Sequence, residues 1–389
     1  MPLLNRNRLL LAKIEGTYGT DSSPTGSNAI LVRNLNPTPQ NGESISRDLI
    51  RPYLGNSPQL PGAINAMVEF EVEMAGSGTA GVVPAYGELL RACGFAEKIL
   101  AAAVTGTAAA GSATTITLAA GASAVDGAYK GMRIDITGGT GSGQYATIRD
   151  YVGSTKVATF METLTTPLNA TSAYSIGPQV AYTPVSSSFE SLTAQYRVRD
   201  QAGQDVMHKS TGARGTVALS IAAKAIPTFK FRFTGLYNTP VDIAAVTPVF
   251  TGFQQPLASN TVNTPTISLH GVTPVLQSLD IDLANLIVHR ALIGSESVLL
   301  TDRKAGGNVV FEATTVATKD WWTIAKNATL GPLYVVQGTT AGNKVAVASG
   351  YAQIVKPGYT DIDGIAMLQA GLSLNPSTAG NDEVAIQVF

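Results

Sequence analysis

The chain has 389 residues, enough for one large domain or two to three ordinary ones. Only 14% of its residues are charged and the formal net charge is −1, which excludes an overall basic footprint for holding nucleic acid. A single cysteine, Cys93, excludes an intrachain disulfide framework and a cysteine-clustered metal site. Low charge together with abundant Gly, Ala, Thr and Val is typical of a protein whose surface is largely covered by copies of itself.

The start of the chain, residues 1–13, contains no apolar run long enough for a signal peptide. No apolar stretch of 18 residues occurs anywhere in the sequence, so no membrane-spanning helix is expected. We therefore expect a protein that is made and folded in a cytoplasm.

Three segments alternate apolar and charged residues with the period of a β-strand, at 68–74, 229–233 and 278–283. The outward-facing side chains are Glu69, Glu71 and Glu73 in the first segment, Lys230 and Arg232 in the second, and Asp280 and Asp282 in the third. One apolar and one polar face are typical of strands in an antiparallel sandwich or barrel. The pattern predicts a mainly β fold.

Helical spacing is rare and is clearest in two segments. In 84–94, Pro84 suits the first turn of a helix and Gly94 suits its end. A second candidate helix covers 317–327, with Trp321 and Trp322 among its apolar members.

Three changes of composition divide the chain. Residues 36–62 are polar and rich in Pro, Asn and Gly, which in a compact domain indicates a functional or disordered segment. Residues 101–177 begin with an Ala/Gly/Thr run and continue with short strands, which predicts a small β module inserted into a host domain. Residues 239–266 are rich in Pro and Thr and are interpreted as a linker.

Removal of the module exposes a weak internal repeat. The first copy has a Leu-Gly turn, an alternating strand and a helix in the order 53–57, 68–71 and 89–90. The second copy has the same features in the order 292–296, 309–312 and 321–322. We interpret the repeat as two β domains, each with a flanking helix. The predicted boundaries are 1–100 with 178–245 for the first domain, 101–177 for the module and 246–389 for the second domain.

No motif carries catalytic chemistry. The glycine-rich segment 138–143 lacks the Gly-Lys-Ser/Thr of a phosphate-binding loop and is interpreted as a turn. The three histidines lack metal-ligand spacing, and no serine lies in a Gly-x-Ser-x-Gly motif. The three glutamates on segment 68–74 could suggest glycosidase carboxylates, but such a row more often forms a solvated or partner-facing surface. We expect no enzyme, no cofactor and no metal.

Several segments carry a resemblance to a known family. They are 10–20, 46–48, 51–55, 70–73, 86–94, 212–217, 364–368 and 380–383. On these segments the chain resembles the major tail tube proteins of long-tailed bacteriophages, of the siphophage type. Residues 101–177 resemble small modules inserted into phage virion proteins.

The resemblance implies two packed β-sheets with a flanking helix, assembled into stacked six-fold rings around a channel for double-stranded DNA. Most members have one such domain, whereas this chain has two predicted copies, so three chains would form a pseudo-six-fold ring. The implied partners are the chain itself, the terminator, tape-measure and distal tail proteins, and DNA that passes without specific binding. The implied location is the virion tail, assembled in the host bacterial cytoplasm and away from membranes.

The same resemblance suggests roles for individual residues. Segment 36–62, together with 1–12, is the expected arm that reaches into the adjacent ring, although a mobile surface loop is the alternative. The arm residues proposed for stacking are Asn36, Arg47, Asp48, Arg51 and Tyr53. Because each phosphate that Lys or Arg neutralises adds DNA affinity, a conduit should present acidic or neutral groups. The candidate channel-facing residues are Asp280, Asp282, Glu69, Glu71 and Glu73, although these faces could instead form subunit contacts.

Three other classes of protein remain open on the sequence. A capsid decoration or other virion shell protein would not need the long arm or the repeat. A carbohydrate-binding, adhesin-like β protein should have clustered exposed aromatics, but only 7% of the residues are aromatic. An enzyme is disfavoured by the missing motifs. We expect the module to project outward and therefore the tail to be non-contractile.

Overall fold

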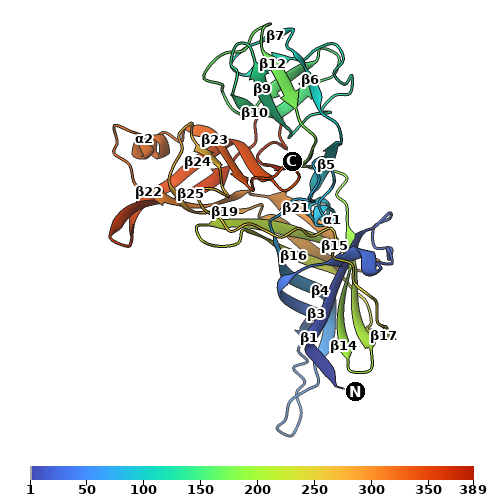
Figure 1. Ribbon diagram of the computed structural model, residues 1–389. Helices are drawn as coiled ribbons and strands as arrows, with labels where there is room; N and C mark the ends of the chain where they lie inside the picture. Colours follow the sequence, from blue (N-terminus) through green and yellow to red (C-terminus); the bar gives the residue numbers. More distant parts are fainter. Residues whose placement is uncertain (1) are drawn as a thin grey trace.

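The computed structural model describes residues 2–389; residue 1, part of the predicted arm segment 1–12, lies outside them. The described residues form 26 strands, two short α-helices and one 3-10 turn, and Figure 1 shows packed sheets with little helical cover. The predicted mainly β fold is confirmed. Within residues 2–389, no helix has both the length and the apolarity that a bilayer crossing requires.

A central antiparallel sheet runs through the molecule in the order β3-β4-β16-β15-β19-β22-β25-β24. Its strands are β3 (Arg33–Ile45), β4 (Leu60–Glu73), β15 (Gln204–Ala222), β16 (Thr228–Tyr237), β19 (Leu276–Asp282), β22 (Gly306–Glu312), β24 (Val345–Ile362) and β25 (Ile365–Leu374). The three segments predicted as alternating strands lie within β4, β16 and β19 to within one residue at their ends, which confirms those predictions.

The alternation of apolar and charged residues along β4 and β16 places the apolar side chains in a core beneath this sheet. Phe70, Phe231 and Phe233 are at most 2% exposed, and the rings of Phe70 and Phe231 stack with centroids 5.6 Å apart. Burial of each such ring contributes about 2–3 kcal/mol relative to leaving it in water. The charged residues between them point to the other face, because successive side chains of a strand point to opposite sides.

A second layer covers the apolar face. Its strands are β1 (Leu3–Ile14), β2 (Ala29–Ile30), β5 (Phe95–Leu100), β13 (Gln179–Pro184), β14 (Leu192–Asp200), β17 (Val241–Ala244), β18 (Thr266–Leu269), β23 (Leu330–Gln337) and β26 (Ala385–Val388). The 3-10 turn η1 (Gly26–Asn28) precedes β2. The long strands β15 and β24 pair in both layers and so connect them.

Strand pairings recur along the chain. We call residues 2–100 with 178–245 the first half and residues 246–389 the second half. In the first half the pairings are β1·β14, β3·β4, β4·β16, β14·β15, β15·β16 and β15·β17. In the second half the matching pairings are β18·β23, β19·β22, β22·β25, β23·β24, β24·β25 and β24·β26. The pair β15·β19 joins the two halves edge to edge.

Each half contains one short helix. The helix α1 (Gly87–Ala92) buries Leu89 and Leu90 completely, and α2 (Trp321–Lys326) buries Trp321 against Phe311 at a ring distance of 5.0 Å. The Asp320 side chain caps α2 by accepting a hydrogen bond from the Thr323 N–H. Both predicted helices are confirmed, and both are shorter than expected because turns occupy their predicted ends.

Residues 104–176 form a separate seven-stranded sheet with its own hydrophobic core, at the top of Figure 1. Its strands are β6 (Val104–Thr107), β7 (Ala110–Gly111), β8 (Thr115–Thr117), β9 (Arg133–Gly138), β10 (Tyr145–Val152), β11 (Val157–Phe160) and β12 (Ala173–Ile176). We call residues 101–177 the module. The chain enters it from β5 and leaves it into β13, and these two strands pair with each other.

The module is also fixed to the second layer. The Arg133 guanidinium donates to the Tyr334 hydroxyl on β23 (3.1 Å) and lies 4.1 Å from the ring centroid of Tyr145. The Gln387 side chain on β26 donates to the Gly131 carbonyl (2.9 Å). The module therefore docks on the layer that faces away from the polar side of the central sheet.

Two interpretations of composition need correction. Much of the polar segment 36–62 is not irregular: β3 runs to Ile45 and β4 starts at Leu60, so only 46–59 lack strand structure. Segment 239–266 is not wholly a linker, because β17 lies within it. Edge pairing overrides composition in both places, and prolines are tolerated because β3 is an edge strand.

Candidate functional surfaces

The outer face of the central sheet collects the acidic residues singled out above. Residues directly opposite one another in an antiparallel pair point to the same side. Glu71 is opposite Lys230, Lys230 is opposite Ala218 and Ala218 is opposite Asp282. The same relation through neighbouring rungs brings all five candidates to one face: Glu69, Glu71, Glu73, Asp280 and Asp282. We call this surface the polar face.

Basic side chains neutralise one part of the polar face. Arg232 lies opposite Glu69, with Nε 3.1 Å from Oε1, and Arg33 approaches Glu73 at 3.6 Å. The basic row of β16 thus meets the acidic row of β4 across a strand boundary. Both pairs are partly exposed, so each contributes at most about 1 kcal/mol.

The other part of the polar face keeps its negative charge. Asp280 and Asp282 are exposed, and their rung partners on β15 and β22 are uncharged: Ser220, Ala218, Asn308 and Gly306. The Asp282 carboxylate accepts a hydrogen bond from the Ala284 N–H (2.7 Å). Within residues 2–389 neither aspartate forms an ion pair.

The irregular segment 46–59, which we call the arm, projects at the bottom of Figure 1 close to the N-terminus. The structure places Arg47, Asp48, Arg51 and Tyr53 in the arm, whereas Asn36 lies in β3 opposite Glu69. The arm also exposes large apolar side chains, with Ile50 and Leu54 fully exposed and Tyr53 64% exposed. Several fully exposed large apolar side chains on one loop indicate a contact surface.

A second hairpin, β20 (Asn285–Leu292) with β21 (Ser295–Arg303), follows β19 and ends in a turn that fully exposes Ile293. In contrast to the arm, this hairpin packs on β15 and β16 of the first half. The Asn285 amide donates to the carbonyls of Cys93 (2.7 Å) and Gly215 (2.9 Å). Hydrogen bonds to two separate segments of the first half fix the base of the hairpin.

Residues from the family-like segment 10–20 also hold this hairpin. The Tyr18 hydroxyl accepts a hydrogen bond from the Val298 N–H (2.6 Å), and Arg214 donates to the Val298 carbonyl (2.9 Å) while lying over the Tyr18 ring at 4.8 Å. Sequence reasoning assigned no role to Tyr18, Arg214 or Asn285. The only signal was the segment's resemblance, because spacing does not reveal contacts between residues nearly 300 positions apart.

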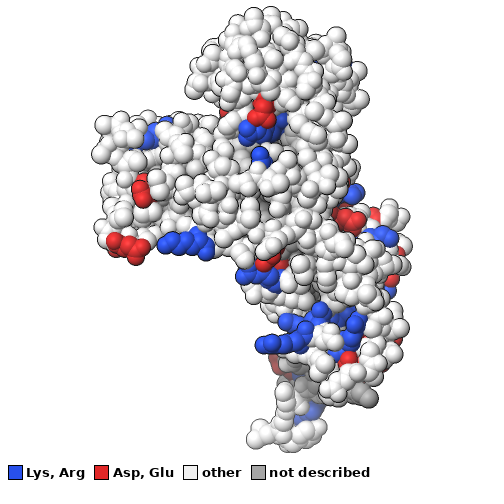
Figure 2. Space-filling view, viewed as in Figure 1, with Lys and Arg blue, Asp and Glu red and all other residues white. Residues whose placement is uncertain are grey.

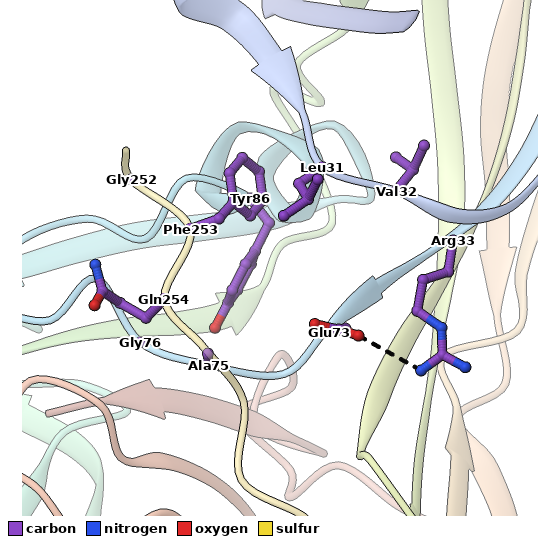
Figure 3. A pocket seen from close by; sticks show the side chains of 10 residues that line it. All are labelled: Leu31, Val32, Arg33, Glu73, Ala75, Gly76, Tyr86, Gly252, Phe253 and Gln254. Atoms are coloured by element: carbon purple, nitrogen blue, oxygen red, sulfur yellow. Dashed lines mark ion pairs between the residues drawn. The ribbon is translucent and has the colours of Figure 1, made fainter. Parts of the chain in front are cut away.

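A shallow pocket lies beside the start of β3. Leu31, Arg33, Glu73 and Tyr86 line it together with Phe253, and Figure 3 shows Leu31, Tyr86 and Phe253 on one side and the Arg33–Glu73 ion pair on the other. Burial raises the pKa of the Tyr86 phenol, whose hydroxyl has no hydrogen-bond partner. Within residues 2–389 no group of three or more His, Cys, Asp or Glu side chains is arranged to hold a metal ion.

Charge is sparse on the side of the molecule seen in Figure 2. The module is almost uniformly uncharged above its base, the body carries scattered charges, and Lys and Arg gather lower down, towards the arm. This distribution fits a protein that buries large neutral surfaces against other protein.

The chain was also compared with known proteins. A family model described as phage tail tube protein matches residues 5–371, which is nearly the whole chain. The comparison with curated proteins finds no match.

Proposed function

Because the chain belongs to the phage tail tube protein family, we propose that it polymerises into stacked rings forming the tail tube of a siphophage, the conduit for double-stranded DNA during ejection. A structural role in the virion tail follows from that membership. Further tail proteins, namely the terminator, the tape-measure and the distal tail protein, are the proposed partners. The proposed place of assembly is the host bacterial cytoplasm.

One observation carries the ring proposal. Six strand pairings recur in the two halves, and β15 of the first half pairs with β19 of the second. The chain therefore already contains one lateral contact between two equivalent units. Three chains would supply six units, and repetition of the same contact would close a ring with pseudo-six-fold symmetry.

The polar face is the proposed lining of the channel. The polar face carries five acidic candidates and three basic neighbours, Arg33, Lys230 and Arg232, so negative charge is in excess. Repulsion from Asp280 and Asp282 would keep a polyanion centred, and the few cations would release few counterions. The lining would let DNA slide without specific binding.

The arm is the proposed contact between rings, with the β20–β21 turn as a second one. Both expose isoleucine or leucine side chains completely, at Ile50, Leu54 and Ile293. Burial of one such side chain against the adjacent ring contributes about 1.5–3 kcal/mol. The arm would fix its conformation when it binds, as segments that order on association do.

The module is proposed to be an inserted domain on the outside of the tube. It docks on β23 and β26 in the second layer, which lies opposite the polar face. An outward module would collide with a contractile sheath, so we propose a non-contractile tail.

Negative-stain electron microscopy of the concentrated protein, with averaging of end-on views, tests the proposal. The expected result is hollow tubes with three-fold rings that show six similar inner lobes. True six-fold rings would retain the tube and contradict the pairing of halves. A protein that enters virions without forming tubes would favour another shell protein, and one that never enters virions would favour an adhesin-like β protein.

A further inference from the structure

The C-terminal part of β24 has an unpaired edge. Residues 345–353 of β24 pair with β23 on one side, but beyond them that side meets no strand among residues 2–389. Tyr359 is 64% exposed and Ile365, just past the turn, is 54% exposed. An exposed apolar edge is a template for pairing with another chain.

The other end of the central sheet has a second free edge. Within residues 2–389, β3 pairs only with β4, and the pocket of Figure 3 lies at its first residue, Arg33. Leu31 is 47% exposed beside it. Tyr86 lines the pocket, and its hydroxyl is buried without a hydrogen-bond partner among residues 2–389.

The junction between β15 and β19 shows how two such strand edges pair inside the chain. Residues 218–222 of β15 pair with residues 278–282 of β19. Two backbone hydrogen bonds hold the turn that follows β15 against residues that precede β19 in the chain. The Ala223 N–H donates to the Gln277 carbonyl (2.8 Å), and the Lys224 N–H donates to the Ser259 carbonyl (2.9 Å). A strand edge and a turn therefore bind together at this junction.

The ladders show which residues are equivalent. The pairs β14·β15 and β23·β24 each contain a bulge, at 210–213 and at 349–352. Counted from these bulges, with one extra residue in β24 near Pro357, Ser220 corresponds to Thr360. Counted through β4 and β22, Asp280 corresponds to Asn36.

We propose that β24 of one chain pairs with β3 of a second copy, with Thr360 opposite Asn36, and that the β24–β25 turn enters the pocket beside Arg33. This inference rests on the proposed function and names the surface that closes the ring. Ser220 and Asp280 form the corresponding rung inside the chain.

The turn and the pocket are complementary. Asp363 (φ +56°) and Gly364 (φ +78°) form a narrow two-residue turn. In the proposed pairing, this turn brings Asp361 and Asp363 of one chain towards Arg33 of the second copy. Ile365 follows the turn and provides apolar surface for the pocket's exposed leucine.

The β3 edge is selective. Pro37 and Pro39 cannot donate hydrogen bonds, so the pairing is confined to a few rungs and unrelated strands are discouraged. The Arg8 side chain donates to the Leu35 carbonyl at 3.3 Å in the isolated chain. That exposed contact must break when the second copy binds.

Cysteine cross-linking tests the register. In one chain β3 and β24 are separated by seven steps of about 4.8 Å, roughly 34 Å, so a bond between Asn36→Cys and Thr360→Cys must join two chains. The native Cys93 is fully buried and does not compete. The matched control combines Thr360→Cys with Gln40→Cys, four residues along β3 and therefore about 13 Å out of register.

Mild oxidation of the concentrated N36C/T360C protein should give covalent dimers and closed trimers on a non-reducing gel, at least about tenfold more than the Q40C/T360C control. Tubes that form without this cross-link would overturn the inference and leave the proposed function intact. Specific cross-linking without tubes would support the inference and count against the proposed function. Equal cross-linking of both variants would also overturn the inference.

A substitution in the turn gives an independent measurement. Ile365→Asp should reduce the amount of pelleted polymer several-fold without changing the melting temperature, because the side chain is exposed in the single chain. Val125→Asp, at a 67% exposed site in the module, is the matched control and should polymerise normally. Normal polymerisation of the Ile365→Asp protein would overturn the placement of the turn.

Discussion

The two long hairpins of this molecule occupy the same place in the recurring strand order and differ in what covers them. The β20–β21 hairpin of the second half packs on the first half, fixed by Asn285, Tyr18 and Arg214. The β3–β4 hairpin of the first half ends in the exposed arm. The hairpin that nothing covers inside the chain is therefore the one left for a second copy of the chain to bind.

Removal of the arm gives the largest expected effect. Replacement of residues 46–59 by an Asn-Gly turn should leave the melting temperature unchanged within about 4 °C, because the exposed arm contributes little to the fold. Formation of tubes should be lost. Calorimetry and electron microscopy of the same sample measure the two effects, and tubes of normal length would show that the arm does not connect rings.

The docked hairpin should behave in the opposite way. Asn285→Ala leaves the buried carbonyls of Cys93 and Gly215 without their donor and should lower the free energy of unfolding by about 2–3 kcal/mol. Urea unfolding measures this loss. Asn56→Ala in the arm is the control and should change stability by less than about 0.5 kcal/mol. Equal losses in both variants would remove the distinction between the two hairpins.

The docked module offers a pH test of the same distinction. Burial raises the pKa of Glu162 from 4.5 to about 7, against the lowering influence of the Thr147 N–H and Arg133, and its Oε1 atom has no partner. Between these pH values the folded chain keeps a proton that the unfolded chain has lost. Stability should therefore fall as the pH rises through this window and level off above about 7.

Glu162→Gln removes the titrating proton and should flatten this part of the profile. Melting temperatures at pH 5 and pH 8 compare the two proteins. Asp126→Asn, elsewhere in the module, is the control and should retain the slope. A parental protein with no slope between these values would contradict the burial of a neutral carboxyl group.

The smallest expected effect concerns charge on the polar face. Asp280→Lys with Asp282→Lys places cations where the sheet has unpaired acids, and each added phosphate contact raises DNA affinity. DNA ejection from particles should slow several-fold at low salt, and the difference should shrink as salt rises. Asp302→Lys on β21 is the control. Unchanged ejection at every salt concentration would remove these aspartates from the channel lining.

Much of the fold could be predicted because alternation is local. The stretch with Val68, Phe70 and Val72 specifies one apolar face without reference to any other segment, and β4 follows. The strand character of the polar stretch with Pro37 and Pro39 comes from pairing with β4, which local composition does not report, so the sequence alone indicates an arm there.

The internal repeat is a second case in which local sequence does not report how strands pair. Sequence similarity aligns Phe70 with Phe311, whereas the ladders align Val72 with Phe311, two residues further on. A shift of two residues keeps every side chain on its face, so the burial pattern tolerates it. The candidate acidic residues could be predicted as outward-facing for this reason, but their arrangement on one surface required the strand order.

The β15·β19 junction has a consequence for the kinetics of assembly. In the proposed ring, half of the lateral contacts exist before two chains ever meet, and linkage within one chain replaces bulk concentration by an effective concentration in the millimolar range or above. Mass action then makes the population of closed rings scale with the third power of chain concentration, where six separate units would give the sixth. A duplicated chain therefore nucleates rings at concentrations at which its single-unit counterpart would remain dispersed.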